Sequence, residues 1–539
     1  MVNKKSQPNT LEITNFDGRL TRIKNGKINS GFAKFNTSFG YDPFSKPGQL
    51  TWFEAPVDLD PNDTSIALTM VCGKTRIESN QLYVYAIGTN YSNAAKLFKI
   101  QPNSLGNPNL DSSSVIATLT NNSFLFGGSM EFFGGNTSVL TVTNDTKLLT
   151  INTTGSGESS KSTFFSANTY HPLTKYLGKI FAGDGVNLTS MDASLTVTSS
   201  VLSPGLPVDT NIRDVGVTPE GNYLSMAASA IPPERQDAPY DVVSAAGGSG
   251  YVFNWNGSDG GVTNYKSFPS HAITSFRTYM NNQYLFSNDS FGASLSDGNQ
   301  KLLTLTNNRS VIPNAVATNG NFITWTSTEF VDSTLKGSMY YFGSLDKEVP
   351  AGLWRMFRQV SSQTNGFIYT VPFNMTIENK FSTLNNAQTS VISYGFGKHY
   401  FSTYDIANGG SPIKYKLYRF CVTSTGTGTP QAGVWETQNQ LFSKRVSLSE
   451  IRVYTEPTVT GNGFQLDLIG NDGNVISNGT FTYSFAAGTD ITLLQGALER
   501  INFNTDIKPV YSLGIRITNT GSTNMTINKI EIDWVESGK

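Results

Sequence analysis

Charge, cysteine, histidine and helical periodicity are all scarce in this sequence. Charged residues make up 15% of the 539 residues and the formal net charge is −1, whereas an average soluble protein has a charged share of about 25%. No stripe of Lys and Arg stands out. Direct binding of nucleic acid is therefore not expected, because the basic surface that such binding requires is missing.

Long apolar runs are also missing. No run is long enough for a transmembrane helix, which needs about 18 apolar residues or more, so we expect no insertion into a membrane. The basic N-terminal stretch MVNKKSQPNT is not followed by an apolar segment. We therefore expect no signal peptide, and synthesis in a cytoplasm.

The residues that usually carry chemistry are few. The two cysteines, Cys72 and Cys421, lie in apolar strand-like runs and are interpreted as buried free thiols. The only histidines are His171, His271 and His399, and no known spacing of metal ligands occurs. We expect no catalytic residue, no cofactor and no metal; the alternative is a metal held by His171 and His271, which precede the first strands of two predicted units.

What the sequence does contain is a β pattern. Alternating β-branched and aromatic runs, broken every 8 to 12 residues or so by Asn, Gly, Asp or Ser, fill nearly the whole chain. The best candidate for a helix is the short segment ITLLQGALER, Ile491–Arg500. The fold class is therefore predicted to be all-β.

One hairpin recurs along the middle of the chain. The segment VGVTPEGNYLSMA, Val215–Ala227, reads as strand, tight turn and strand. Related hairpins have their turns at Asn80, Gly134, Gly178, Asn282, Gly320 and Gly397. A third strand is predicted to follow most of them, in the segments AKLFKI, TKLLTIN, GYVFNW, QKLLTLT, SMYYFG and YKLYRFCV.

A repeat of roughly 40 to 55 residues with three or four antiparallel strands is typical of a β-propeller. We predict seven blades, in which each blade covers the apolar faces of its neighbours; a further hairpin near Gly366 leaves eight as the alternative. Closure of the ring predicts that Cys72, in the first blade, and Cys421, in the last, lie near each other or in neighbouring blades. A disulfide between them would need Cα atoms about 4.4–6.8 Å apart.

The two ends of the chain differ from the repeat. Residues 439–539 carry longer alternating strands and are predicted to form a β-sandwich behind a propeller at 61–438. Residues 1–60 are predicted to be an extended arm. Its aromatic residues lie outside any repeat, so they are candidates for docking to a neighbouring subunit: Phe16, Phe32, Phe35, Tyr41, Phe44 and Trp52.

The longest insert within a blade is Ile231–Gly250, and function often resides in such loops. Its polar residues are the candidates for a ligand-binding loop: Glu234, Arg235, Asp237, Tyr240 and Asp241. A solvated loop is the alternative interpretation of the carboxylates.

The chain also resembles structural proteins of tailed bacteriophages. The resemblance lies in NFDGRL (Asn15–Leu20), INSGFAKF (Ile28–Phe35), YDPFSKPGQLTW (Tyr41–Trp52) and LGIRITNTGSTNMTINKIEIDW (Leu513–Trp534), joined to a polar propeller. It implies a non-enzymatic virion component of the tail or the host-attachment apparatus, with other virion proteins as partners in a symmetric homo-oligomeric assembly. Two alternatives stay open, namely a protein that binds a host receptor or glycan, and a propeller glycosidase, which would need a pair of carboxylates across a pocket.

Overall fold

The computed structural model describes most of the first four blades, the sandwich, and the backbone of the strands in between. The described residues are 9–16, 35–42, 48–52, 57–58, 69–89, 95–101, 111–121, 123–124, 128–133, 138–154, 157–166, 170–218, 220–230, 250–258, 260–268, 433–456, 463–484, 497–502, 507–520 and 525–537, together with the strands between His271 and Cys421, of which only the backbone is described. Every regular element among them is a β-strand.

Seven groups of antiparallel strands follow one another along the chain, and each group is a blade of four strands. Blades 1 to 4 are β6–β9 (Thr69–Glu78, Gln81–Thr89, Ala95–Gln101, Asp111–Leu119), β10–β13 (Ser129–Phe132, Val139–Thr143, Lys147–Asn152, Gly157–Thr163), β14–β17 (Leu173–Tyr176, Lys179–Asp184, Asn187–Met191, Val197–Thr198) and β18–β21 (Thr210–Val217, Leu224–Ala230, Gly250–Trp255, Asn264–Phe268). Blades 5 to 7 are β22–β25 (His271–Tyr279, Asn282–Asp289, Gly292–Ser296, Lys301–Thr304), β26–β29 (Trp325–Thr326, Ser338–Gly343, Gly352–Ser361, Thr364–Asn374) and β30–β32 (Ala387–Gly395, Lys398–Asp405, Lys414–Cys421) with β5 (Val57–Asp58).

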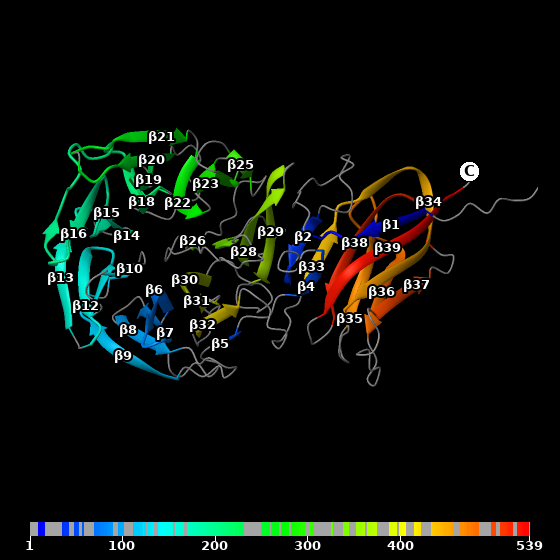
Figure 1. Ribbon diagram of the computed structural model, residues 1–539, viewed down its shortest axis with the longest axis horizontal. Helices are drawn as coiled ribbons and strands as arrows, with labels where there is room; N and C mark the ends of the chain where they lie inside the picture. The colour runs from blue at the N-terminus through cyan, green and yellow to red at the C-terminus, as the bar shows by residue number, and fades with distance from the viewer. Residues whose placement is uncertain are drawn as a thin grey trace, which may run out of the picture.

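The blades close into a ring (Figure 1). The first strand of each blade contacts the first strand of the next, from β6 through β10, β14, β18, β22 and β26 to β30, and β30 contacts β6. The short strand β5 pairs with β32 and so supplies the outermost strand of blade 7 from the start of the chain. The chain is therefore a seven-bladed β-propeller, and the hairpin suspected near Gly366 is β29, the fourth strand of blade 6.

The apolar cores lie between neighbouring blades, as the repeat predicted. The strands β18 and β19 of the Val215–Ala227 hairpin pair from Val217 with Leu224 onward. Leu224 and Met226 are buried, and they belong to a core that also contains Phe181 and Leu188 of blade 3. Each blade thus covers its neighbour, since a single four-stranded sheet could not bury both of its faces.

The ring also places the two cysteines in adjacent blades. Cys72 lies in β6, and β6 contacts β32, the strand that ends at Cys421. Cys72 is a buried free thiol, so the disulfide alternative is wrong. Burial raises the pKa of this thiol to about 12, which leaves it protonated at neutral pH.

Three predictions about individual segments are corrected. The segment SMYYFG is β27, the second strand of blade 6, and QKLLTLT contains β25, the fourth strand of blade 5, so neither is a third strand. Within Ile491–Arg500, the best candidate for a helix, the described residues begin β37 (Ala497–Asn502). Pairing with β34 decides this conformation, because tertiary context overrides local helix propensity.

Residues near both ends of the chain form one β-sandwich. One sheet contains β4 (Leu50–Trp52) and β1 (Asn9–Ile13) beside β39 (Thr526–Glu536), β34 (Gln440–Thr455) and β37, with β3 (Tyr41–Asp42) paired to β4. The other contains β2 (Phe35–Phe39), β33 (Val434–Thr437), β38 (Val510–Asn519), β35 (Gly463–Ile469) and β36 (Val475–Ser484). Ile530 and Ile532 of β39 are fully buried in the core of the sandwich, while Trp534 is partly buried against Phe442.

The N-terminal segment is part of this sandwich and not an extended arm. Phe16, Tyr41 and Trp52 are at most 1% exposed and lie in the sandwich core. The ring of Phe16 meets Trp435 edge to face at 5.2 Å, and Tyr41 packs on Trp52 at 4.9 Å. The boundaries predicted at residues 60 and 438 therefore do not separate an arm from the sandwich.

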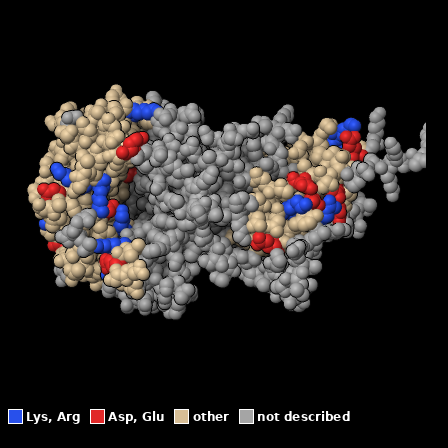
Figure 2. Space-filling view, in the orientation of Figure 1, with Lys and Arg blue, Asp and Glu red and all other residues tan. Residues whose placement is uncertain are grey.

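The sandwich lies beside blade 6, across the ring from blades 2 and 3 (Figure 1). A parallel pair between Phe39 of β2 and Val371 of β29 joins the two domains. On the face shown in Figure 2, acidic and basic side chains of the described part are interspersed, with no large patch of one sign.

Glycine at position 183 allows blades 3 and 4 to approach closely. A Cβ atom there would lie 2.8 Å from Ile212 Cγ2 and 3.1 Å from the ring of Pro172. We expect Gly183→Ala to lower the free energy of unfolding by about 1–3 kcal/mol, because overpacking displaces a buried neighbour. Urea denaturation measures this. Gly157→Ala is the control, since nothing lies within 4 Å of a Cβ at that position; an equal loss in both variants would contradict the packing argument.

Candidate functional site

Two pockets lie at opposite ends of the strands in the described blades. In an antiparallel blade, the turns that join the first strand to the second and the third to the fourth share one face of the propeller. The turns from the second to the third strand and the connections between blades share the other. One pocket opens on each face, so they are separate sites.

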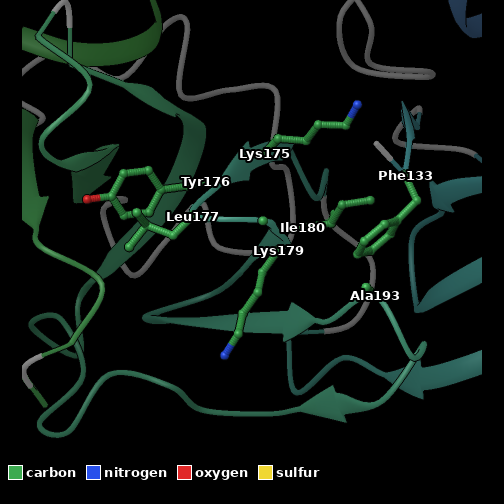
Figure 3. Close-up of a pocket in the computed structure, with 8 residues that line it drawn as sticks. Phe133, Lys175, Tyr176, Leu177, Lys179, Ile180 and Ala193 are labelled. Atoms are coloured by element: carbon green, nitrogen blue, oxygen red, sulfur yellow. The ribbon is translucent and has the colours of Figure 1, made fainter. Parts of the chain in front are cut away.

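The first pocket has a volume of about 360 Å³ and lies at the β14–β15 turn. Its lining is Phe133, Lys175, Tyr176, Leu177, Gly178, Lys179, Ile180 and Ala193. Figure 3 shows that the side chains of Lys175 and Lys179 project in opposite directions. The polar groups do not converge on a ligand, which weakens this pocket as a binding site.

Lys175 and Tyr176 of the first pocket already have partners. The Lys175 ammonium lies 3.1 Å from Glu131, whose other oxygen pairs with Lys74 at 2.6 Å. These three residues come from β14, β10 and β6, so the trio ties together the first strands of three blades. The hydroxyl of Tyr176 donates to the carbonyl oxygen of Asn222 at 2.6 Å. These groups hold blades together.

The second pocket, of about 500 Å³, lies between blades 3 and 4 on the other face. Its lining is Phe165, Ser166, Asp184, Gly185, Val186, Asn187, Ser200, Val208, Asp209, Thr210 and Asn211. Three segments supply these residues: the connection from blade 2 to blade 3, the β15–β16 turn, and the connection from blade 3 to blade 4. We refer to this set of residues as the blade 3/4 pocket.

Asp184 fixes one wall of the blade 3/4 pocket. It is 3% exposed, and its two carboxylate oxygens accept the backbone N–H groups of Phe165 at 3.1 Å and Ser166 at 2.9 Å. Gly185 follows in a two-residue turn with φ +61°, a conformation that favours glycine. The carboxylate is therefore used to hold the connection that carries Phe165.

Asn187 and Thr210 fix the opposite wall. The side-chain amide of Asn187 donates to the carbonyl oxygen of Leu202 and accepts the Leu202 N–H, at 3.0 and 2.9 Å. The Thr210 hydroxyl donates to the carbonyl oxygen of Pro207 at 2.7 Å. Both side chains are engaged in holding the connection from blade 3 to blade 4, so the pocket is built on a fixed backbone.

Other groups of the blade 3/4 pocket are available to a ligand. The side chains of Phe165 and Val208 are 78% and 94% exposed. Asp209 is exposed and Asn211 is half-buried, and neither side chain has a hydrogen-bond partner among the residues that the structure describes. The pocket can therefore offer an aromatic face together with carboxylate and amide groups.

His171 lies beneath the blade 2 to blade 3 connection. Its ring stacks on Phe164 with 3.8 Å between ring centroids, and Nδ1 lies 2.7 Å from the carbonyl oxygen of Gly183. Burial lowers the pKa of His171 below its ordinary value, which favours the neutral ring. The side chain of His271, the other histidine of the metal alternative, lies outside the described residues. Within the described part of the chain, no three or more His, Cys, Asp or Glu side chains group into a possible metal site.

The structure overturns part of the predicted site and does not describe the rest of it. Phe16, Tyr41 and Trp52 are buried in the sandwich, so they cannot dock to a neighbouring subunit. Phe32, Phe44 and the side chain of Phe35 lie outside the described residues. The predicted ligand-loop residues Glu234, Arg235, Asp237, Tyr240 and Asp241 also lie outside them.

The ends of the 231–250 insert are nevertheless placed by the fold. The insert joins β19 to β20, so it leaves the propeller on the face that carries the blade 3/4 pocket. Ala230, the residue before it, pairs with Thr210 of the pocket. The residues that flank the insert therefore lie on the face of the blade 3/4 pocket, while residues 231–249 themselves lie outside the described residues.

Sequence reasoning missed Phe165, Val208, Asp209 and Asn211. The segment SPGLPVDTN, which contains three of them, has the Pro, Gly and Asp composition of a loop between strands. That composition identifies a connection between blades. It does not show that two connections about 40 residues apart in the sequence form one pocket.

Among the described residues, no helix is long and apolar enough to span a membrane.

No protein-family model and no curated protein sequence matches the chain. Among solved structures, the chain is similar to an exo-β-1,3-galactanase of Phanerochaete chrysosporium bound to β-1,3-galactotriose, with 10% identity, 90% of this chain and 99% of that chain covered, and a TM-score of 0.30. It is also similar to the sialidase of Trypanosoma rangeli, with 8% identity, coverage of 90% and 96%, and a TM-score of 0.32. The Dos1 propeller gives 10% identity, coverage of 64% and 75%, and a TM-score of 0.36. These likenesses carry no argument about activity, and the strand pairing itself defines the propeller.

Proposed function

We propose that this chain is a non-enzymatic structural component of a tailed-bacteriophage particle, in the tail or the host-attachment apparatus. The resemblance that suggests this role lies in segments near the two ends of the sequence. Phe16, Tyr41 and Trp52 from the first end share one core with Leu513, Ile515 and Ile530 from the second. This single observation supports the proposal, because the resemblance then belongs to one folded domain.

In this proposal the sandwich attaches the chain to other virion proteins and the propeller extends away from it. Blades 2 and 3 lie at the end of the molecule opposite the sandwich (Figure 1). Because Phe16, Tyr41 and Trp52 are buried, contacts with other subunits would be made by exposed residues of the sandwich. Tyr511 is one such residue: it is 54% exposed and lies under the Arg445 guanidinium. Symmetric packing of several copies would use the same surface on each copy.

The carboxylates of the blade 3/4 pocket are consistent with a non-enzymatic role. A glycosidase needs two carboxyl groups that are free to act as acid and as base or nucleophile. Both oxygens of Asp184 accept backbone N–H groups, which leaves Asp209 as the other carboxylate of the lining.

The location of the protein in purified particles tests the proposal. Particles from the culture that produces the chain are examined by mass spectrometry and by immunogold electron microscopy with antibodies against the isolated protein. We expect a fixed copy number per particle and gold label confined to the tail. Pre-immune antibodies are the control, and a protein that is absent from washed particles would contradict the role.

A further inference from the structure

The two most exposed large apolar side chains of the described residues line the same pocket. Val208 is 94% exposed and Phe165 is 78% exposed, ahead of Leu177 at 67% and Tyr265 at 65%. They come from different connections, one on each side of blade 3. Exposed apolar side chains that gather at one pocket, rather than lie scattered over the surface, are typical of a site of interaction.

The backbone that carries these side chains is held in place. Asp184 accepts the N–H group of Phe165 itself, and the Leu206 N–H donates to the carbonyl oxygen of Val186 at 2.8 Å, close to Val208. The Ile212 N–H donates to the carbonyl oxygen of Gly185 at 2.9 Å. A ligand that meets a pre-formed site loses less free energy to ordering of the protein.

Asp209 and Asn211 supply the polar side-chain groups of the pocket that are available to a ligand. Asp209 offers carboxylate oxygens, and Asn211 offers both an acceptor and a donor. The Asn211 oxygen lies 3.8 Å from the position of a Cβ on Gly185, so this side chain reaches the β15–β16 turn at the pocket wall. The ligand should therefore carry several hydroxyl groups, which can donate to a carboxylate and exchange hydrogen bonds with an amide.

The charge of the lining restricts the ligand further. No Lys or Arg lines the blade 3/4 pocket, while Asp184 and Asp209 both do. An anionic ligand would meet carboxylates without a compensating cation. The lining therefore favours a neutral ligand over an acidic one.

We propose that the blade 3/4 pocket binds a neutral sugar unit of a polysaccharide. A pyranose ring has an apolar face of C–H groups, which fits the exposed ring of Phe165, and hydroxyl groups around its edge, which fit Asp209 and Asn211. The volume of about 500 Å³ lies in the range of small-molecule sites and suits a short oligosaccharide segment. This inference goes beyond the proposed structural role and does not depend on it.

Binding of the full-length protein to an array of neutral and acidic oligosaccharides tests the inference. We expect at least one neutral oligosaccharide to bind, and titration calorimetry then measures its affinity. Phe165→Ala and Asn211→Ala should each weaken binding by about tenfold, the loss that follows from removing one stacked ring or one hydrogen-bonding group. Far-UV and near-UV circular dichroism establish that each variant is folded.

Tyr265→Ala is the matched control, because Tyr265 is an aromatic residue of similar exposure on β21, the outermost strand of blade 4. The affinity of the Tyr265→Ala variant for the oligosaccharide should stay within about twofold of that of the unaltered protein. The inference is overturned if no neutral oligosaccharide binds, if only acidic ones or a divalent cation such as Ca²⁺ bind, or if Phe165→Ala and Tyr265→Ala behave alike. A protein found in the tail that binds no sugar would overturn this inference alone, and a sugar-binding protein absent from particles would overturn only the structural role.

Discussion

A chain that begins at residue 61 is expected to lose the native fold of both domains. Such a chain lacks β1 to β4, which belong to the two sheets of the sandwich, and β5, which completes blade 7. The remaining strands would expose the core surface that Phe16, Tyr41 and Trp52 now cover. Near-UV circular dichroism and urea denaturation measure the outcome, and we expect no cooperative transition of native amplitude.

A single substitution in the sandwich core tests the same role of the N-terminal segment with a smaller expected loss of stability. Phe16→Ala removes a fully buried ring that packs edge to face on Trp435. We expect the free energy of unfolding of the sandwich to fall by about 3–5 kcal/mol, the usual cost of emptying such a site. A chain shortened only by residues 1–8, which precede β1, is the control. If the chain that begins at residue 61 unfolded with the native midpoint, the N-terminal segment would be the separate arm that the sequence suggested.

The second large effect concerns the ion network on the outer side of the sandwich. Arg452 of β34 donates to Glu531 at 2.7 Å and to Asp533 at 2.6 Å, and it also pairs with Glu450. The side chains of Arg452, Glu531 and Asp533 are 16%, 10% and 13% exposed. Arg452→Met would leave three carboxylates without this cation.

We expect Arg452→Met to lower the free energy of unfolding by about 1–3 kcal/mol, less than the loss for a fully buried pair because some solvent screening remains. Lys444→Met is the matched control. Lys444 pairs with Glu536 at 2.8 Å on the same sheet, but both side chains are largely exposed. Its loss should change the unfolding midpoint little, and equal effects of the two substitutions would argue against the network.

The same network predicts how the sandwich responds to acid. Burial by itself raises the pKa of Glu531, but hydrogen bonds from Lys529, Arg452 and Tyr454 outweigh it and lower the pKa from 4.5 to about 2. The hydrogen bond from Arg452 likewise lowers the pKa of Asp533. Because these pKa values are lower in the folded than in the unfolded protein, their contribution to stability is complete above about pH 4.5 and is lost as the pH falls towards 2.

Urea denaturation at pH 7, 5, 4 and 3 measures this loss. The unaltered protein should lose stability steadily below about pH 4.5. In Arg452→Met the carboxyl pKa values return towards their ordinary range, so the loss between pH 5 and pH 3 should be smaller. A pH dependence that is identical in both proteins would show that Arg452 does not set these pKa values.

Local sequence patterns identified several hairpin turns and most strands of the propeller, although SMYYFG and QKLLTLT were assigned to the wrong strands of their blades. The turns at Asn80, Gly178 and Gly221 all have positive φ values, and each lies between the first two strands of a blade. Asn471, Asp472 and Gly473 likewise lead from β35 to β36, with Gly473 at φ +78°. Such turns could be found because their backbone conformation requires Gly, Asn or a similar residue.

Pairing between distant strands could not be found in this way. Strand β5 pairs with β32, and β1 pairs with β39 at the far end of the chain. Alternation indicates that a segment is extended and which of its faces is apolar, but not which strand it joins. The sequence suggested that the aromatic residues of the first 60 positions dock to a neighbouring subunit, and only the fold shows that Phe16, Tyr41 and Trp52 pack within their own chain.

By itself the sequence determined the all-β class, a repeated unit of three or four strands and several of its hairpin turns, because these depend on residue alternation and turn conformation over about ten residues. The tertiary structure alone decided that the first strands complete the sandwich and blade 7, and that Phe165 and Asp209 meet at one pocket. The physical reason is that ring closure and sheet pairing are set by the burial of complementary apolar faces. That complementarity involves residues tens to hundreds of positions apart, and no local pattern records it.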